Sequence, residues 1–211
     1  MLDILRKRIP EELSKMKIAV VMGGSSDEKD FSYRSGHEVI YALTNLNLNC
    51  ESIDLDSNVL SNIKDKNIEL VFLATHGVPG EDGRIQGGLD QMGIPYTSAG
   101  VEGSVLAINK IVSKSLLCKC GIQTPDWEMI DAQDSIEDNA QYLTKSLGFP
   151  MIIKPTTGGS SIGVRLCQNV TELRTSLELL LKEHKEIFAE KFIEGRELTV
   201  SVLEDSRSKP Y

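Results

Sequence analysis

The feature of this sequence that most constrains its fold is an alternation of short apolar runs with amphipathic segments through the first half of the chain. Runs of this length are typical of strands. Four of them are residues 17–22, 51–55, 69–74 and 95–97. The segment after Gly23-Gly24-Ser25-Ser26 carries apolar residues at helical spacing, so it predicts a helix between the first two strands. Strands that alternate with helices predict an α/β fold with a parallel, doubly wound sheet.

The second half of the chain also contains both helical and strand patterns. We predict helices over residues 104–120, 135–147 and 171–184, and strands over residues 127–131, 151–153, 164–168, 187–193 and 196–203. A leader helix is expected within residues 1–16, and we place a domain boundary near residue 108. The predicted domains are residues 17–108 and 109–194, with a further unit that begins at residue 195.

A glycine- and serine-rich stretch, residues 154–164, is the strongest candidate for a binding loop. The apolar residues 151–153 lead directly to Lys154. Glycines that follow let backbone N–H groups approach a polyphosphate, while Ser160 and Ser161 add hydroxyl donors. The residue order is not that of a P-loop, and no G-x-G-x-x-G opens a helix here. A flexible hairpin turn is the alternative interpretation of the same residues.

The composition and net charge limit the kinds of molecule that this chain can be expected to bind. The chain has 211 residues, 40% of them hydrophobic, and a net charge of −8. This acidic balance argues against a nucleic-acid or anionic-membrane surface. Residues 1–10 are interrupted by charge too often for a signal peptide or a membrane span. We therefore expect a cytoplasmic protein with small-molecule ligands. A homodimer is a separate expectation. The four cysteines lack the paired spacing of a zinc site, so no metal ligand is assigned.

The loops after the first and third strands are further candidates, because ligands of doubly wound sheets collect beyond the carboxyl ends of the strands. The first loop contains Glu28 and the second contains His76. A carboxylate can hold an ammonium group and a histidine can donate to a carboxylate, which together would bind a zwitterionic amino acid. Each residue also has a structural alternative, since Glu28 can favour a helix N-terminus and His76 can bond a turn carbonyl.

Charged residues in the second half suggest nucleotide contacts. Lys110 begins the second predicted domain and could reach a phosphate, although most lysines on helix surfaces are only solvated. Glu190 and Lys191 interrupt the apolar run at residues 187–193. That interruption fits an exposed sheet edge or an adenine slot.

Taken in chain order, these blocks resemble the D-alanine:D-alanine ligases of the ATP-grasp superfamily over residues 17–205. The blocks that carry the resemblance are Gly23-Gly24-Ser25-Ser26-Asp27-Glu28, Thr75-His76-Gly77, Gly80-Glu81-Asp82-Gly83-Arg84-Ile85-Gln86-Gly87, Tyr96-Thr97-Ser98-Ala99-Gly100-Val101, Asn109-Lys110, the loop at residues 154–164, and Glu190-Lys191. The resemblance implies a pre-ATP-grasp parallel-sheet domain, then a central ATP-grasp α+β subdomain, then a C-terminal ATP-grasp subdomain that is mostly missing. It also implies an enzyme that joins two D-alanines through an acyl phosphate for peptidoglycan precursors, with ATP and Mg²⁺ as cofactors.

The resemblance assigns a role to each candidate residue. Lys110 and Lys154 would contact phosphates, and the loop with Ser160 and Ser161 would close over them. The adenine would lie beside Glu190 and Lys191, and Glu197 would reach the ribose. Glu28 and His76 would hold the first D-alanine, and Ser160 would hold Glu28 in place, which makes Glu28 and Ser160 the catalytic pair.

Two departures from the family pattern leave alternatives open. Asp30-Phe31-Ser32 stands where the family often has Glu-Val-Ser. The family's magnesium ligands lie in a further part of roughly one domain's length that is not found here, and the two acids at Glu204 and Asp205 are not assigned as ligands. The alternatives are an ATP-dependent ligase whose sequence here is a fragment or is completed by another chain, a truncated binding protein without activity, and a plain dinucleotide-binding protein.

Overall fold

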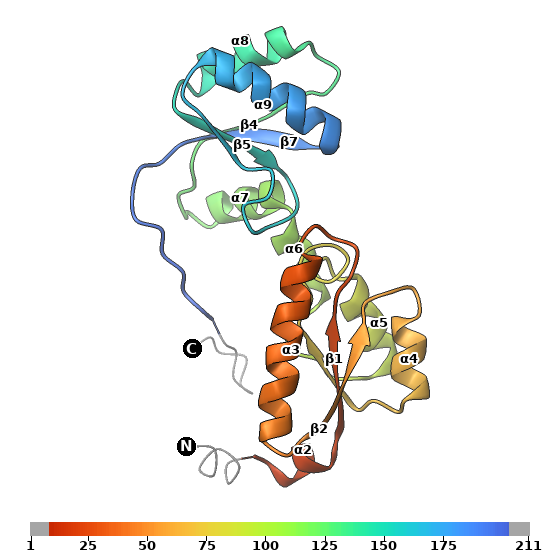
Figure 1. The fold of residues 1–211 in the computed structure, drawn as a ribbon. Coiled ribbons are helices and arrows are strands. Elements are labelled where there is room, and N and C mark those ends of the chain that lie inside the picture. Colours follow the sequence, from red (N-terminus) through yellow and green to blue (C-terminus); the bar gives the residue numbers. More distant parts are fainter. Residues whose placement is uncertain (1–8, 203–211) are drawn as a thin grey trace.

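The computed structural model describes residues 9–202 and arranges them in two lobes, each built around its own sheet (Figure 1). The first lobe contains α2 (Glu11–Lys15), β1 (Lys17–Met22), α3 (Lys29–Asn45), β2 (Asn49–Asp54), α4 (Val59–Asp65), β3 (Leu70–Leu73), α5 (Arg84–Met92) and α6 (Val101–Ile108). The second contains α7 (Lys110–Lys119), β4 (Trp127–Met129), α8 (Ile136–Ser146), β5 (Met151–Pro155), β6 (Arg165–Cys167), α9 (Val170–Glu183) and β7 (Ile187–Lys191). The α/β class predicted from the sequence is confirmed.

The first sheet is parallel, with strand order β2-β1-β3. Side chains of a strand point alternately to the two faces, so Ala19 and Val21 pack toward α4 and α5, while Val20 and Met22 pack toward α3. Helices therefore cover both faces, as the alternating pattern predicted. The fourth strand expected at residues 95–97 is only a single parallel bridge between Val71 and Tyr96.

The second sheet is antiparallel, with strand order β4-β7-β5-β6. Helices α8 and α9 cover one face, and α7 lies on the other (Figure 1). The α8 and α9 side holds the apolar core, in which Met151 and Ile153 of β5 pack with Leu177 of α9. Ser135 and Asn169 accept hydrogen bonds from the first turns of α8 and α9. Caps of this kind stabilise a helix by about 1 kcal/mol.

A break at Asn109 divides the single helix predicted over residues 104–120 into α6 and α7. The backbone of Asn109 is extended, at φ −93° and ψ 110°, and its side chain accepts from the N–H groups of Ile111 and Val112. The apolar spacing continues through this point, which is why the sequence pattern did not reveal the break. Lys110 consequently becomes the first residue of a capped helix.

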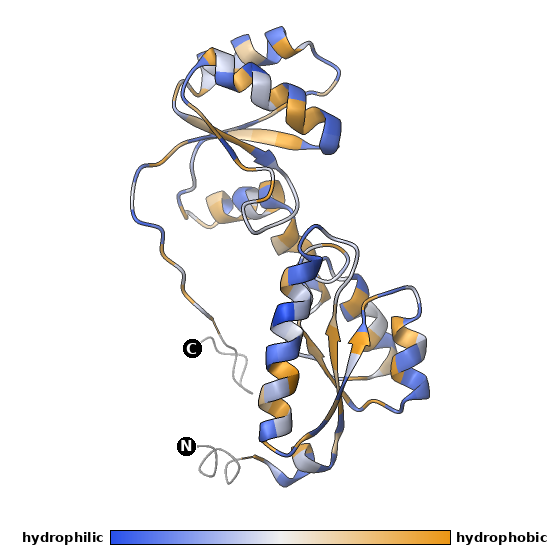
Figure 2. Ribbon diagram, viewed as in Figure 1, coloured by the Kyte–Doolittle hydropathy of each residue, from blue (hydrophilic) through white to orange (hydrophobic). Residues whose placement is uncertain are grey.

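Two other expectations concern the ends of the chain. The leader helix predicted within residues 1–16 is described only from residue 9, where α2 begins at Glu11; residues 1–8 lie outside the described part. The strand predicted over residues 196–203 is wrong for its described part, since residues 196–202 form exposed coil. Figure 2 shows apolar residues along this extended segment, but no described strand lies beside it to accept its backbone hydrogen bonds. Within residues 9–202, no helix has the length and apolar character needed to cross a bilayer.

Candidate functional site

Glu28 is a buried carboxylate at the junction of the two lobes. It precedes α3, and its side chain is 5% exposed. Two glycines make room for it, because a Cβ atom on Gly77 would stand 3.0 Å from Glu28 Oε2 and one on Gly159 would stand 3.1 Å from Oε1. The glycines belong to different lobes, so both lobes are shaped around this one carboxylate.

Ser160 joins the loop of the second lobe to Glu28. Its hydroxyl donates to Glu28 Oε1 at 2.5 Å. Ser160 and Ser161 both lie in the left-handed region, at φ 49° and 59°, a conformation that costs a residue with a side chain about 1–3 kcal/mol. The tight turn thus presents the Ser160 hydroxyl to Glu28.

A cleft of about 330 Å³ opens beside this contact. Its walls come from the loop after β1, from Gly77 and Val78, and from the glycine-rich loop. Ser26 braces the first-lobe wall, because its hydroxyl donates to the backbone oxygen of His76 at 2.7 Å and accepts from the N–H of Glu28 at 3.3 Å. The cleft combines a carboxylate with glycine and serine walls and with the apolar side chains of Val78, Pro155 and Ile162, a mixture that suits a small amino acid.

His76 lies on the first-lobe side of this arrangement. Its Nε2 is 3.2 Å from the hydroxyl of Ser35 on α3. His76 lines a separate cavity of about 290 Å³ that it shares with Thr75 and Glu81. Its backbone is therefore tied to the Glu28 cleft through Ser26, while its ring faces the neighbouring cavity.

Lys110 is bound to the glycine-rich loop at two points. Its backbone N–H donates to Thr156 O at 2.8 Å and its ammonium donates to Gly158 O at 2.7 Å. Burial and the nearby charge of Lys154 lower the pKa of Lys110, and the carboxylates of Glu28 and Glu190 offset part of this decrease. Two ammonium groups close enough to repel one another form a site that favours an anion.

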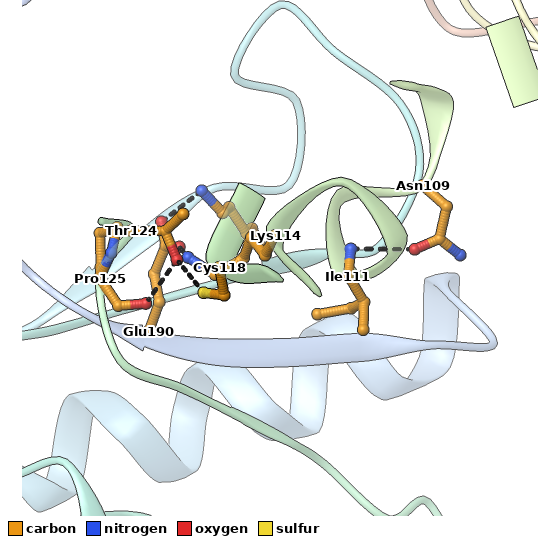
Figure 3. A network of polar contacts seen from close by, with 8 residues as sticks. Asn109, Ile111, Lys114, Cys118, Thr124, Pro125 and Glu190 are labelled. Atoms are coloured by element: carbon orange, nitrogen blue, oxygen red, sulfur yellow. Dashed lines mark hydrogen bonds and ion pairs between the residues drawn. The ribbon is translucent and has the colours of Figure 1, made fainter. Parts of the chain in front are cut away.

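Glu190 accepts from two lysines on the α7 side of the second sheet. Lys154 binds its Oε1, and Lys114 of α7 binds its Oε2 at 2.8 Å. Figure 3 shows Lys114 and Glu190 side by side, with Asn109 capping the helix that carries Lys114. Burial alone would raise the pKa of Glu190, but the two ammonium hydrogen bonds outweigh it and hold the pKa below its usual value.

The predicted site residues fall into two groups. The structure brings together Glu28 and Ser160, and it places Lys110 and Lys154 within electrostatic reach of one another. The side chains of Ser161, Lys191 and Glu197 are exposed and, among the described residues, make none of these contacts. Their predicted roles at the nucleotide remain predictions.

Sequence reasoning missed two residues at the site. Lys114 has no predicted role, although it is buried and paired with Glu190. Its spacing of four from Lys110 is a usable signal, because residues four apart share a helix face. His184 likewise has no predicted role, yet it follows the last residue of α9 as its C-cap and lines the Glu28 cleft. No local pattern marks His184, since only tertiary packing brings it there.

A metal centre has no donor set in the described part of the chain. Among residues 9–202, no group of three or more His, Cys, Asp or Glu side chains is arranged to hold an ion. Mg²⁺ prefers carboxylate and phosphate oxygens, and both Glu28 and Glu190 are already engaged with serine or lysine. The described residues do not fit a protein-bound magnesium site.

Comparison with protein families places this architecture among known relatives. The family model described as "D-ala D-ala ligase C-terminus" matches residues 116–210. A D-alanine–D-alanine ligase of Carboxydothermus hydrogenoformans is 39% identical over 193 residues, which is 90% of this chain and 62% of that protein. The Nitrosomonas europaea ligase is 38% identical over 189 residues, 90% of this chain and 61% of its own length. The chain thus spans about three-fifths of these curated relatives.

Solved structures give the same result. A D-alanine–D-alanine ligase from Bacillus anthracis superposes with a TM-score of 0.75 at 34% identity, covering 93% of this chain and 69% of that one. Another crystal structure of the Bacillus anthracis ligase, complexed with ATP, superposes with a TM-score of 0.72 at 35% identity, covering 85% of this chain and 60% of that one.

Proposed function

Because this chain belongs to the D-alanine–D-alanine ligase family, we propose that its two lobes bind ATP and the first D-alanine of an ATP-dependent ligation that yields D-alanyl-D-alanine for peptidoglycan precursors. The observation that carries the proposal is the hydrogen bond between Ser160 and Glu28, which joins the phosphate-binding loop to the carboxylate of the amino-acid cleft. Nucleotide and amino acid would therefore lie on adjacent sides of one loop.

The amino-acid half of the site rests on Glu28. A zwitterionic amino acid offers an ammonium group, and a buried carboxylate is its natural partner because charge-assisted hydrogen bonds strengthen away from water. The small walls contributed by Gly77 and Gly159 fit a methyl side chain. In this proposal Glu28 and His76 hold the first D-alanine, and Glu28 orients it so that its carboxylate faces the lysines.

The nucleotide half rests on Lys110, Lys154 and the loop between β5 and β6. Phosphoryl transfer depends on positioning and on positive charge around the transferring group. Lys110 and Lys154 supply that charge, and Gly158, at φ 92°, lets the loop N–H groups approach the phosphates. Glu190 and Lys191 would line the adenine pocket, with Glu197 at the ribose.

The proposed reaction has two steps. An oxygen of the first D-alanine's carboxylate attacks the γ-phosphorus, which breaks the bond to the β-phosphate oxygen and releases ADP. The amine of the second D-alanine then attacks the acyl phosphate, which forms the amide, releases phosphate and loses a proton. Closure of the loop excludes water from the acyl phosphate between these steps.

Calorimetric titration tests the two halves separately. ATP is expected to bind the chain, and Lys154→Ala should weaken that binding at least about tenfold, because it removes a phosphate contact. Lys145→Ala, at an exposed lysine of α8, is the control and should leave the affinity unchanged. Glu28→Gln should abolish D-alanine binding while preserving ATP binding. Equal ATP affinity in Lys154→Ala and the unmodified chain would show that Lys154 does not contribute to ATP binding.

A second candidate function is binding without turnover. The observation that favours it is the lack of a metal donor set among residues 9–202. ADP release that depends on D-alanine separates the two functions. Our expectation is that this chain alone binds both ligands but releases no ADP; D-alanine-dependent ADP release would show that these residues suffice for the first step.

A further inference from the structure

Lys114 is a buried cation for which the proposed function gives no role. Its side chain is 9% exposed, and its ammonium lies 2.8 Å from Glu190 Oε2. A lysine is seldom buried unless an acidic partner neutralises its charge. That partner, Glu190, also pairs with Lys154. One carboxylate therefore has two ammonium partners, one more than is needed to neutralise its charge.

The geometry of the second sheet explains how the three groups meet. Glu190 of β7 stands opposite Ile152 of β5, and Lys154 is two residues further along β5. Residues two apart on a strand share a face, so Lys154 is a diagonal neighbour of Glu190. Helix α7 crosses this face and places Lys114 one turn beyond Lys110 (Figures 1 and 3).

The two lysines differ in how accessible they are. The side chain of Lys154 is 21% exposed against 9% for Lys114. Lys154 also interacts electrostatically with Lys110, the other lysine of the proposed phosphate site. Lys154 is therefore the partner nearer the open side of the site, and Lys114 is the enclosed one.

We propose that Lys114 is a positioning residue that keeps Glu190 neutralised while Lys154 exchanges Glu190 for a polyphosphate oxygen. The inference rests on the proposed function, because it requires Lys154 to bind phosphate. Each oxygen of Glu190 has its own lysine, so Lys154 can leave Oε1 without leaving a buried carboxylate unpaired.

Without Lys114, the same carboxylate would have Lys154 as its remaining ammonium partner. A buried carboxylate without a counter-charge is strongly disfavoured, so Glu190 would hold Lys154 back from the phosphate. An arriving polyphosphate would then have to break that ion pair. The expected consequence is weaker polyphosphate binding that acts through Lys154.

Titration with inorganic tripolyphosphate tests this, because the probe lacks an adenine that could contact Glu190. Lys114→Met is expected to weaken binding about tenfold, whereas Lys119→Met, an exposed lysine of the same helix, should change it by less than about twofold. Adding Glu190→Gln to Lys114→Met should restore the affinity to within about threefold of the unmodified chain, because Lys154 is no longer retained. Thermal unfolding of each variant confirms that it is folded.

A double-mutant cycle with Lys154→Ala distinguishes two ways in which Lys114 could affect binding. Lys114 could act by positioning Lys154, or its charge could attract the polyphosphate directly. If Lys114 acts through Lys154, Lys114→Met should cause less than about a twofold further loss in the Lys154→Ala background. A full tenfold loss in that background, or unchanged binding by Lys114→Met alone, would overturn the inference while leaving the proposed function intact. Failure of the unmodified chain to bind tripolyphosphate would overturn both.

Discussion

The hydroxyl of Ser160 donates a 2.5 Å hydrogen bond to Glu28 Oε1 across a sequence separation of 132 residues. The bond joins the left-handed turn of the second lobe to the first residue before α3. It is the direct polar link between the proposed phosphate loop and the proposed amino-acid cleft.

Loss of the Ser160 hydroxyl should loosen the loop. Ser160→Ala removes a charge-assisted hydrogen bond, and amide exchange over residues 156–164 should become roughly tenfold faster. Ser161→Ala is the matched control, because Ser161 is also left-handed but its hydroxyl makes no contact with Glu28. Hydrogen–deuterium exchange measured by mass spectrometry provides the readout. Equal protection in the two variants would mean that the bond does not restrain the loop.

Glu190 should make the free energy of unfolding depend on pH in the acidic range. Its pKa is lowered in the folded chain, so below the ordinary glutamate range the unfolded chain takes up a proton before the folded chain does. The free energy of unfolding should therefore fall as the pH decreases from about 4.5 toward the folded pKa. Urea titration at a series of pH values is the measurement.

Glu190→Gln should flatten that acid dependence and lower stability near neutral pH by about 3 kcal/mol, because two lysines lose their carboxylate. Glu178→Gln, an exposed change on α9, is the control and should leave both quantities as they are. A steep acid dependence that persists unchanged in Glu190→Gln would assign it to other groups.

The two lobes should respond separately to changes in their cores. Leu177 is fully buried in the second core, and none of that core's residues belongs to the first. Leu177→Ala should destabilise the second lobe by about 2–5 kcal/mol. Leu179→Ala, more exposed on the same helix, should cost less than about 1 kcal/mol. Amide exchange should accelerate in β5 and β7 but not in β1; equal acceleration in both sheets would indicate one cooperative unit.

The extended segment after β7 should promote self-association. Leu198, Val200 and Val202 alternate along it and are 79%, 82% and 66% exposed. An unpaired, alternating apolar segment is a template for pairing with another chain. Val200→Lys should shift the chain toward monomer in light scattering at rising concentration. A distribution of species that does not change with this substitution would exclude the segment as the contact.

Much of the fold could be predicted from local pattern, because the strands and helices that form it are strongly periodic. The run at residues 17–22 is buried on both faces as a central parallel strand should be. The break at Asn109 escaped prediction because capping by one asparagine interrupts a helix without changing its apolar spacing. The strand expected at residues 196–203 failed because a strand needs a hydrogen-bonded neighbour, which local propensity does not supply.

The candidate site, like the fold, could be predicted only in part from local sequence pattern. Lys154 and Glu28 could be singled out because each lies near a glycine-rich turn in the sequence, and Lys110 because it begins the second predicted domain. The Lys114–Glu190 pair could not, since its members are 76 positions apart and meet only when α7 crosses the sheet. The pairing of the ring of His76 with Ser35 likewise depends on how α3 lies over the first sheet.

Both the backbone N–H and the ammonium group of Lys110 donate hydrogen bonds to the glycine-rich loop. Rotation about the extended Asn109 would therefore carry α7 and the loop together, while the first lobe with Glu28 stayed behind. Within residues 9–202, such a motion would break the hydrogen bond between Ser160 and Glu28. Opening would thus expose the proposed amino-acid cleft while Lys110 keeps both hydrogen bonds to the loop.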